Sequence, residues 1–420
     1  MKRHVIIGNG IAGISAAETI RSLQPQADIS IIAAESFPPY SRPMISLVLE
    51  GRIKHDRLPI RGPDFYRRLA INSIIGEKAI SIDVDRRRVI TDGGQIVEYD
   101  RLLIATGADP RPIKATGTNL ENVSFLRTEA HVRKIVQALS TVRHALVLGG
   151  GLVGFKAAYG LMRRGIKVTM LISSGYPLSM QVDAIAGRLI LDELVSNGLE
   201  IRTGVEATAF TGHRAVKEAY LSDGGSVECQ LVMIGKGVLP ALDFVPKDKI
   251  HLDLGIVVDN NLQTSVPGIF AAGDVAQAMD VVRNQTWVNA IWPVAAEQGV
   301  VVGSNMAGRP VSYRGSLGRN VMRIFGLNVM SGGMVHPPPG QGYNILSRLD
   351  PIHKFYRKVT LRDDTLIGLT MIGDIEHGGV ILSLIQRQLP LTVEPELLLE
   401  PSFNFSTLLA GMSPERRYTA

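Results

Sequence analysis

The sequence has 420 residues, which is too long for one ordinary hydrophobic core, so two or three domains are expected. Hydrophobic residues make up 45% and charged residues 20%, as in soluble globular domains. The formal net charge is +6, but no run of like charge is long enough to form a tail that binds nucleic acid, which excludes that class of partner.

The cysteine content and the lengths of the apolar segments restrict the class of protein further. The single cysteine, Cys229, excludes an internal disulfide and fits a reducing compartment. No apolar segment reaches about 18 residues, so no membrane span is expected. The basic, apolar start leads into a glycine turn rather than a cleavage site, unlike a signal peptide. These features predict a cytoplasmic protein.

The first segments in chain order predict a βαβ unit. "HVIIGNGIAGISAAETIRSL" reads as an apolar strand, a glycine turn and an amphipathic helix, and "ADISIIAAE" supplies the next strand. "AISIDVDRRRVITDGGQIVEYDRLLIATG" then predicts a hairpin around DGG and a buried strand. The proline-rich "ADPRPIKATG" that follows is predicted to be a linker.

The middle of the chain repeats this pattern. "HALVLGGGLVGFKAAYGLMRRG" followed by "IKVTMLI" is a second βαβ unit, and "SVECQLVMIG" predicts a strand after another DGG turn. Two glycine fingerprints in one chain imply two nucleotide-binding domains, or one domain inserted in another. "TSVPGIFAAGDVA" predicts one more apolar strand, and "WPVAAEQGVVVGSNMAG" predicts a helix with proline in its first turn.

The pattern of predicted secondary structure changes from about Tyr313. "FYRKVTLRDDTLIGLTMIGD" alternates like a hairpin around RDD, "GGVILSLIQRQ" is helical, and "VHPPPGQG" is a loop. The predicted fold class is therefore α/β, with two Rossmann-like domains in three ββα layers and a C-terminal α+β domain.

The first fingerprint, "GNGIAG", contains Gly8, Gly10 and Gly13. Bare amides at a helix start can approach a pyrophosphate, and the helix dipole favours its negative charge. Glycines also serve plain turns, so the stronger signal is Glu35 at the end of the next strand. Its carboxylate can accept hydrogen bonds from both hydroxyls of a ribose.

The second fingerprint lacks that acid. Ile172 stands where the acid is expected, and an aliphatic side chain neither hydrogen-bonds a ribose nor repels a phosphate. Ser173 and Ser174 can donate to a 2′-phosphate, but no arginine follows closely, so the positive charge that favours NADPH is missing. Weak discrimination between NADH and NADPH is expected, and a turn that binds nothing stays an alternative.

The order of these motifs along the chain resembles that of a known protein family. The order GNGIAG, Glu35, "PPYSRPMIS", ATG, GGGLVG, "TSVPGIFAAGD" and "WPVAAEQG" resembles the two-dinucleotide flavoproteins of the pyridine nucleotide-disulfide oxidoreductase superfamily over almost the whole chain. The chain looks most like the rubredoxin and ferredoxin reductase group. It is closer still to the flavoprotein part of the nitrite reductase large subunit, whose C-terminal domain "YRKVTLRDDTLIGLTMIGD" resembles.

The resemblance implies a domain plan and two cofactors, FAD and either NAD(H) or NADP(H). It places a discontinuous FAD-binding domain at 1–112 and 250–312, an NAD(P)-binding domain at 113–249, and a C-terminal α+β interface domain at 313–420. It places these residues near FAD: Gly8, Gly10, Ile11, Ala12, Gly13, Ala34, Glu35, Arg42, Pro43, Lys78, Ala79, Ala105, Thr106, Gly107, Arg127, Gly273, Asp274, Trp292 and Pro293. The residues that it places near the nicotinamide nucleotide are Gly149, Gly151, Leu152, Val153, Gly154, Ile172, Ser173 and Gly235.

Three of these residues have a specific expected role. Asp274 can accept from a hydroxyl chain such as ribityl. Trp292 and Pro293 are expected at the flavin ring, where a helix start stabilises charge on reduced flavin. A core aromatic is the alternative for Trp292.

Other residues depart from the family pattern. Lys156 stands where an acid usually follows the second fingerprint, and Leu47 replaces a lysine that some members place after "LS". Disulfide reductases and their relatives need cysteine beside the flavin, and "SRPMIS" has none, which excludes thiol chemistry.

The predicted function is therefore an FAD-containing, NAD(P)H-dependent oxidoreductase with no catalytic side chain. One cysteine cannot hold an iron–sulfur cluster, so electrons must pass to or from an iron–sulfur or other redox partner, and the chain is expected to be the flavin subunit of a multi-subunit enzyme. Nitrite reductases, ferredoxins and tungsten aldehyde oxidoreductases are the candidate assemblies. An acidic partner suits the pI of about 9.4, and both homo- and hetero-oligomers stay open. The alternatives are an FAD-binding assembly subunit with a degenerate nicotinamide site and a stand-alone NADH oxidase.

Overall fold

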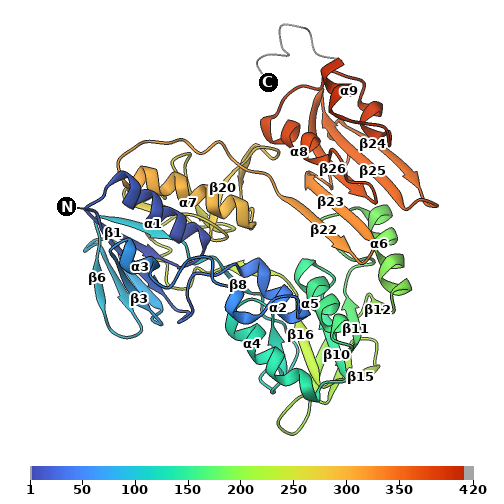
Figure 1. Cartoon of the computed structure of the whole chain (residues 1–420), viewed down its shortest axis with the longest axis horizontal. Coiled ribbons are helices and arrows are strands. Elements are labelled where there is room, and N and C mark those ends of the chain that lie inside the picture. Colours follow the sequence, from blue (N-terminus) through green and yellow to red (C-terminus); the bar gives the residue numbers. More distant parts are fainter. Residues whose placement is uncertain (1, 411–420) are drawn as a thin grey trace.

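The computed structural model describes residues 2–410, and Figure 1 shows three layered units. The N-terminal unit (blue) includes helix α7 (Trp292–Met306) from much later in the chain. A second unit (green) follows it in sequence, and the C-terminal sheet (orange and red) lies near helix α6 (Ala184–Ser196) of that second unit. The predicted α/β fold class with a C-terminal α+β unit is confirmed, whereas the residue limits of the domains stay predictions.

The first unit is a parallel sheet in the order β19-β7-β1-β2-β3. Its strands are short apolar runs, as expected for a sheet that is covered on both faces. Helix α1 (Ile11–Leu23) packs against α7, and the antiparallel meander β4-β5-β6 shares the same hydrophobic core, which gives the three layers. The parallel strands are β1 (Arg3–Ile7), β2 (Asp28–Ala33), β3 (Ile71–Ile75), β7 (Arg101–Ile104) and β19 (Ile269–Ala271).

The meander corrects the prediction of a single hairpin. "AISIDVDRRRVIT" folds as two strands because Arg87, at φ 52°, closes a turn before the DGG turn. The three strands are β4 (Ala79–Asp83), β5 (Arg88–Thr91) and β6 (Ile96–Glu98).

The second unit repeats the first, with a parallel sheet in the order β12-β11-β10-β16-β9. "SVECQLVMIG" is not one strand, because the chain leaves the meander β13-β14-β15 at Cys229 and enters the parallel sheet at Leu231. The parallel strands are β9 (Val123–Phe125), β10 (His144–Leu148), β11 (Lys167–Ile172), β12 (Glu200–Thr203) and β16 (Leu231–Ile234). The covering elements are α4 (Glu129–Ala138), α5 (Leu152–Arg163), α6, β13 (Ala207–Thr211), β14 (Glu218–Leu221) and β15 (Ser226–Glu228).

Two short strands connect the first two units. The proline-rich segment that was predicted as a linker contains β8 (Ala108–Pro110), which pairs antiparallel with β17 (Val238–Pro240). Proline is tolerated there because each strand lies at the edge of a two-stranded sheet. The remaining strands of the first unit are β18 (Ile256–Val257), β20 (Ala276–Asp280) and β21 (Gln285–Trp287). Helix α2 (Ile45–Glu50) packs against α4 and α5 of the second unit, and η3 (Leu139–Thr141) follows α4. The other short helices are η1 (Arg42–Met44), η2 (His55–Arg57) and α3 (Phe65–Arg68).

The C-terminal unit is an antiparallel sheet in the order β22-β23-β26-β25-β24. The hairpin predicted around RDD is confirmed as β25 and β26, but both strands are buried on both faces. One face shares a hydrophobic core with α6, and the other shares a core with α8 and η4. The elements are β22 (Arg319–Ile324), β23 (Leu327–Gly333), β24 (Tyr343–Asp350), β25 (Phe355–Arg362), β26 (Thr365–Ile372), α8 (Gly378–Arg387), η4 (Pro395–Leu399) and α9 (Phe405–Ala410). None of the helices in residues 2–410 is both long and apolar enough to cross a bilayer.

Candidate dinucleotide-binding site

The two glycine turns have the same backbone geometry. Gly8 and Gly149 take φ of 122° and 102°, a region that favours glycine. A Cβ on Gly13 would collide with the carbonyl oxygen of Gly8, and a Cβ on Gly154 would collide in the same way with that of Gly149. Each turn therefore needs its glycines for close packing of a helix on a strand, as the fingerprint predicts.

Both helices begin without a side-chain cap. The N-cap residues of α1 and α5 are Gly10 and Gly151, and a Cβ on either would meet nothing within 4 Å. The first amides of both helices thus face open space with no side chain to accept from them. Bare N–H groups and the positive end of a helix dipole together form a site for phosphate.

One cavity of about 540 Å³ lies where the first two units meet. Its lining comes from the first glycine turn, the loop after β2, the ends of β7 and β16, helix α5 and the start of α7. The predicted residues that line it are Gly8, Gly10, Ile11, Ala12, Ala34, Glu35, Arg42, Pro43, Lys78, Ala79, Ala105, Thr106, Gly107, Arg127, Val153, Gly235, Gly273, Asp274 and Trp292.

Other predicted residues lie outside this lining. Gly13 packs behind the first turn, and Pro293 is exposed at the start of α7. The glycines of the second turn do not line this cavity, and only Val153 and Gly235 of the residues expected at the nicotinamide nucleotide do so. The remaining six are Gly149, Gly151, Leu152, Gly154, Ile172 and Ser173.

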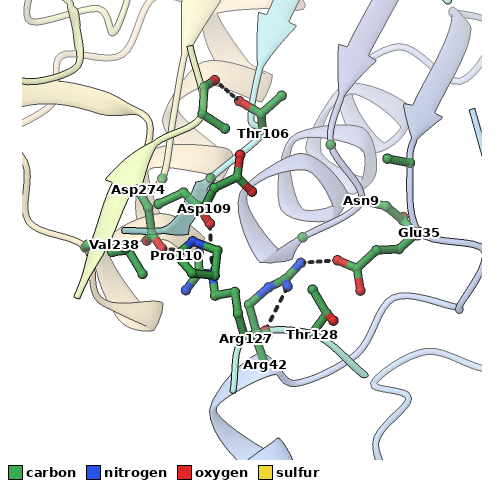
Figure 2. A pocket seen from close by; sticks show the side chains of 18 of the residues that line it. Asn9, Glu35, Arg42, Thr106, Asp109, Pro110, Arg127, Thr128, Val238 and Asp274 are labelled. Carbon is green, nitrogen blue, oxygen red and sulfur yellow. Dashed lines mark hydrogen bonds and ion pairs between the residues drawn. The ribbon is translucent and has the colours of Figure 1, made fainter. Parts of the chain in front are cut away.

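The carboxylate of Glu35 is held in place by two partners. One of its oxygens lies 2.6 Å from the Arg42 guanidinium, and the other accepts from the Tyr40 hydroxyl at 2.7 Å. Figure 2 shows Arg42 between Glu35 and Arg127, whose carbonyl oxygen accepts from Arg42 at 3.1 Å. A carboxylate has about four acceptor positions, so Glu35 can still accept from a ribose. Burial raises the pKa of Tyr40, which therefore stays a donor.

A second ion pair holds Asp274. Its carboxylate lies 2.9 Å from the Arg127 guanidinium, which also donates to the carbonyl oxygen of Ala108 at 2.9 Å (Figure 2). The strand β8 is thereby fixed to the cavity wall. Figure 2 also shows the Thr106 hydroxyl, which donates to the carbonyl oxygen of Ala241 at 3.1 Å.

Several lining residues were not predicted. Phe37, Pro38 and Tyr40 belong to the loop after β2, and the quoted "PPYSRPMIS" was the signal that could have found most of them. Asn9 lies within the fingerprint "GNGIAG", which could have revealed it. The others come from elements whose approach to the cavity depends on tertiary packing. They include Asp109, Pro110, Thr128, His131, Gly237, Val238, Asp243 and Phe244.

Lys156 lines the cavity from helix α5. Burial lowers the pKa of its ammonium, with no carboxylate raising it. The residue stands where the family resemblance expects an acid, so this wall carries a positive charge in place of a negative one.

Strand register gives the counterparts of Glu35 and Ile172 in the other unit. Leu148 pairs with Leu171 as Ile7 pairs with Ile32, so the counterpart of Glu35 is Ser174 and that of Ile172 is Ala33. Ile172 is 1% exposed and packs against Gly150 in the second turn. Glu35 thus lies two residues beyond the end of β2, whereas Ile172 is the last residue of β11.

The structure brings a lysine, rather than an arginine, to the second turn. The ammonium of Lys236 lies 3.3 Å from the Ser173 hydroxyl and 2.8 Å from a carboxylate oxygen of Glu206. Lys236 follows the end of β16 and Glu206 lies beyond β12, so both are more than 50 residues from the fingerprint in sequence. Only the sheet order brings them to Ser173.

Cys229 lies in the core between the parallel sheet and the β13-β14-β15 meander. The side chain is fully buried, and burial raises the pKa of its thiol to about 12. A thiol with that pKa stays protonated and unreactive at neutral pH.

Comparisons with known proteins agree with this geometry. A family model described as pyridine nucleotide-disulphide oxidoreductase matches residues 2–299, and one described as the rubredoxin NAD+ reductase C-terminal domain matches residues 319–389. The chain is 29% identical over 402 residues to the assimilatory nitrate reductase electron transfer subunit of Bacillus subtilis, which covers 95% of this chain and 51% of that protein. The chain therefore spans about half the length of that relative.

Two further comparisons match over nearly the full length. The chain is 29% identical over 393 residues to the NADH-dependent phenylglyoxylate dehydrogenase subunit epsilon of Aromatoleum evansii, covering 93% of each protein. The crystal structure of the ferredoxin reductase for the CYP199A2 system from Rhodopseudomonas palustris has the same fold, with a TM-score of 0.87, 24% identity and coverage of 98% of this chain and 100% of that one. Because the first family model covers more than half of the chain, this protein belongs to the pyridine nucleotide-disulphide oxidoreductase family.

Proposed function

We propose that this protein moves electrons between NAD(P)H and an iron–sulfur partner, as the flavin subunit of a larger enzyme. The cofactors of the family are FAD and a pyridine nucleotide. The observation that carries the proposal is a cavity whose wall combines the first glycine turn, helix α5 of the second unit and the start of α7. Such a cavity can bring the reactive ends of two nucleotides face to face.

The residues fit FAD at the first turn. The uncapped start of α1 can hold the pyrophosphate, and Glu35, already oriented by Arg42 and Tyr40, can accept from the adenosine ribose. Asn9 presents a buried side-chain oxygen with no hydrogen-bond partner in the described chain, as expected of a group that a ligand completes. Asp274 can accept from the ribityl hydroxyls while Arg127 holds it in position.

When bound, FAD supplies the conversion of two-electron donation by NAD(P)H into single-electron delivery to a partner. The chain's part is positional and electrostatic. Trp292 opens α7 without a side-chain cap, so the positive end of that helix faces the cavity. Lys156 adds a cation to the opposite wall. The cysteine is buried outside the cavity lining, so the proposal involves no thiol step.

The partner and the setting are part of the same proposal. The similar Bacillus and Aromatoleum proteins are an electron transfer subunit and a dehydrogenase subunit by name, which supports a subunit role here. The net charge of +6 supports an acidic partner. The match of residues 319–389 to a rubredoxin NAD+ reductase C-terminal domain supports a C-terminal interface domain at 313–420, of which 411–420 lie outside the described residues. The other domains in the proposal are 1–112 and 250–312 for FAD and 113–249 for NAD(P). The single cysteine supports a cytoplasmic setting.

A matched pair of glycine substitutions tests the proposal. Gly10→Ala and Gly151→Ala each place a methyl group in open space over a helix start, at backbone angles that alanine tolerates. We expect Gly10→Ala to lose yellow colour on purification. We expect Gly151→Ala to keep the flavin but to lose its reduction by NADH and NADPH, measured as bleaching without oxygen and then as transfer to a viologen dye.

The outcomes separate the alternatives. Flavin that is retained in both variants and reduced equally well in both contradicts the proposal. A wild-type protein that holds flavin but binds neither nicotinamide nucleotide supports the assembly subunit with a degenerate second site. Rapid oxygen uptake with NADH and no partner supports a stand-alone oxidase.

A further inference from the structure

The duplicated fold lets each position at the second turn be compared with its counterpart at the first. The end of β1 pairs with β7 as the end of β10 pairs with β16, which makes Lys236 the counterpart of Thr106. The end of β2 pairs with β3 as the end of β11 pairs with β12, and Gly76 and Gly204 then donate to the last residues of β2 and β11. Two residues further on, Glu206 is therefore the counterpart of Lys78.

These counterparts locate the adenosine end of the second site. In the first unit, Ala34, Lys78 and Thr106 all line the cofactor cavity. Their equivalents in the second unit are Ser173, Glu206 and Lys236, which meet at the carboxyl ends of β11, β12 and β16. In a Rossmann fold that edge receives the adenosine ribose, and the groups there choose between a free hydroxyl and a 2′-phosphate.

The charges at this edge are balanced. Lys236 is largely covered, with 19% of its side chain exposed, and it pairs with Glu206, whose side chain is 58% exposed. The hydrogen bond from Lys236 is the main reason that the pKa of Glu206 lies below its ordinary value. Glu206 therefore carries a full negative charge at neutral pH, beside the cation that a 2′-phosphate would seek.

We propose that Glu206 replaces the missing acid of the second fingerprint and makes the chain prefer NADH to NADPH, by accepting from the adenosine ribose and by neutralising Lys236. One oxygen of Glu206 pairs with Lys236, and the Ser173 hydroxyl also hydrogen-bonds this carboxylate. A carboxylate has about four acceptor positions, so Glu206 can still accept from a ribose hydroxyl. A 2′-phosphate would meet this carboxylate at close range, so its attraction to Lys236 is cancelled. This inference rests on the proposed nicotinamide site and adds its specificity.

The test is equilibrium binding, which needs no turnover. Affinities of the flavin-loaded chain for NADH, NADPH, 5′-AMP and 2′,5′-ADP are measured for the wild type and for Glu206→Gln. Glutamine keeps the size and the exposed position but removes the charge. We expect the preference for the phosphorylated nucleotide over its unphosphorylated partner to rise on the order of tenfold, because Lys236 is left unpaired beside the phosphate.

Two further variants sharpen the result. Adding Lys236→Met to Glu206→Gln should return the ratio toward the wild-type value, because no cation then remains at the edge. Asp192→Asn removes one negative charge from α6 of the same unit, where Asp192 pairs with Arg188, and it should leave the ratio unchanged.

The outcomes distinguish this inference from the function on which it rests. A wild type that binds all four nucleotides, with a ratio that Glu206→Gln does not move, overturns the inference and leaves the proposed function intact. A wild type that binds none of them overturns the nicotinamide site itself. A ratio that shifts equally in Asp192→Asn also overturns the inference, because overall charge would then be the cause.

Discussion

The walls of the cavity combine paired and unpaired charges, and the unpaired ones are available to a ligand. Glu35 with Arg42 and Asp274 with Arg127 neutralise one another at distances of 2.6 Å and 2.9 Å. Such pairs orient acceptors without adding net charge. Lys156 adds net positive charge to the opposite wall, where burial lowers its pKa.

Lys156→Gln is expected to lower the midpoint potential of bound flavin. Reduced flavin carries more negative charge than oxidised flavin, and a nearby cation stabilises it. Removing that cation should shift the potential down by roughly 20–60 mV, or about 1–3 kcal/mol for a two-electron couple. The measurement is a dye-coupled redox titration. Lys167→Gln, at the exposed start of β11, is the control, and equal shifts in both variants would contradict a local effect.

Single residues also show which parts of the site could be predicted from the sequence. Both fingerprints predicted strand–turn–helix geometry correctly, because a collision of Cβ with backbone leaves glycine as the only choice at Gly13 and Gly154. Sequence spacing does not give the strand register that makes Ser174 the counterpart of Glu35. Lys236 and Glu206 could not have been found from the fingerprint, since the order of strands in the sheet brings them together.

At the level of elements, the close packing of α1 on α7 positions the first turn. A Cβ on Gly299 would collide with the carbonyl oxygen of Ala12, and one on Gly303 would lie 2.7 Å from that of Ala16. The two helices therefore approach along a line of small residues. Because α1 begins at the cofactor turn and α7 begins at Trp292, this contact fixes two walls of the cavity relative to each other.

Gly299→Ala is expected to destabilise the protein and to weaken flavin binding together. Overpacking a tight helix contact costs about 1–3 kcal/mol, and here the strain moves the start of α1 away from the strand. Thermal denaturation and flavin content after dialysis measure the two effects. Gly175→Ala, in an exposed loop where a Cβ meets nothing within 4 Å, is the matched control. A Gly299→Ala protein as stable and as yellow as the control would show that the helices tolerate separation.

The contact between α6 and the C-terminal sheet depends on buried ionic groups. Burial disfavours the charge of Asp183, but hydrogen bonds from the Ala186 amide, Tyr356 and Lys358 outweigh it and hold its pKa below the ordinary 3.8. The hydroxyl of Tyr356 lies 2.7 Å and the ammonium of Lys358 lies 3.0 Å from the same carboxylate oxygen. The sequence predicted the hairpin that carries both residues, but not the helix against which they pack.

This carboxylate makes the stability of the contact depend on pH. Because its folded pKa is lowered, the stabilisation is complete above the unfolded value of 3.8 and is lost as the pH falls through the folded pKa. Asp183→Asn should cost about 1–3 kcal/mol at pH 7 and flatten the loss of stability in acid. Urea unfolding at pH 7 and near pH 3 measures both values. A variant with the same acid sensitivity as the wild type would assign that sensitivity to other carboxylates.

For the whole molecule, the chain leaves the first unit through β8, completes the second, and returns through β17, so the two crossing strands pair with each other. The cavity lies beside this crossing and includes Pro110 and Val238 in its lining. The sequence indicated the duplication and the return of the chain. It missed the pairing because each strand has only three residues, one of them proline, so strand signals there are weak.

The charge of the whole molecule predicts how electron transfer responds to salt. A net charge of +6 attracts an acidic partner over a distance that salt shortens, from about 30 Å at 0.01 M to about 8 Å at 0.15 M ionic strength. The second-order rate of partner reduction should therefore fall on the order of tenfold across that range. Reduction of a neutral quinone by the same NADH-reduced protein is the control, because it involves no encounter between charges and should stay constant. A partner rate as indifferent to salt as the quinone rate would show that docking depends on apolar contacts, and the basic surface would then need another explanation.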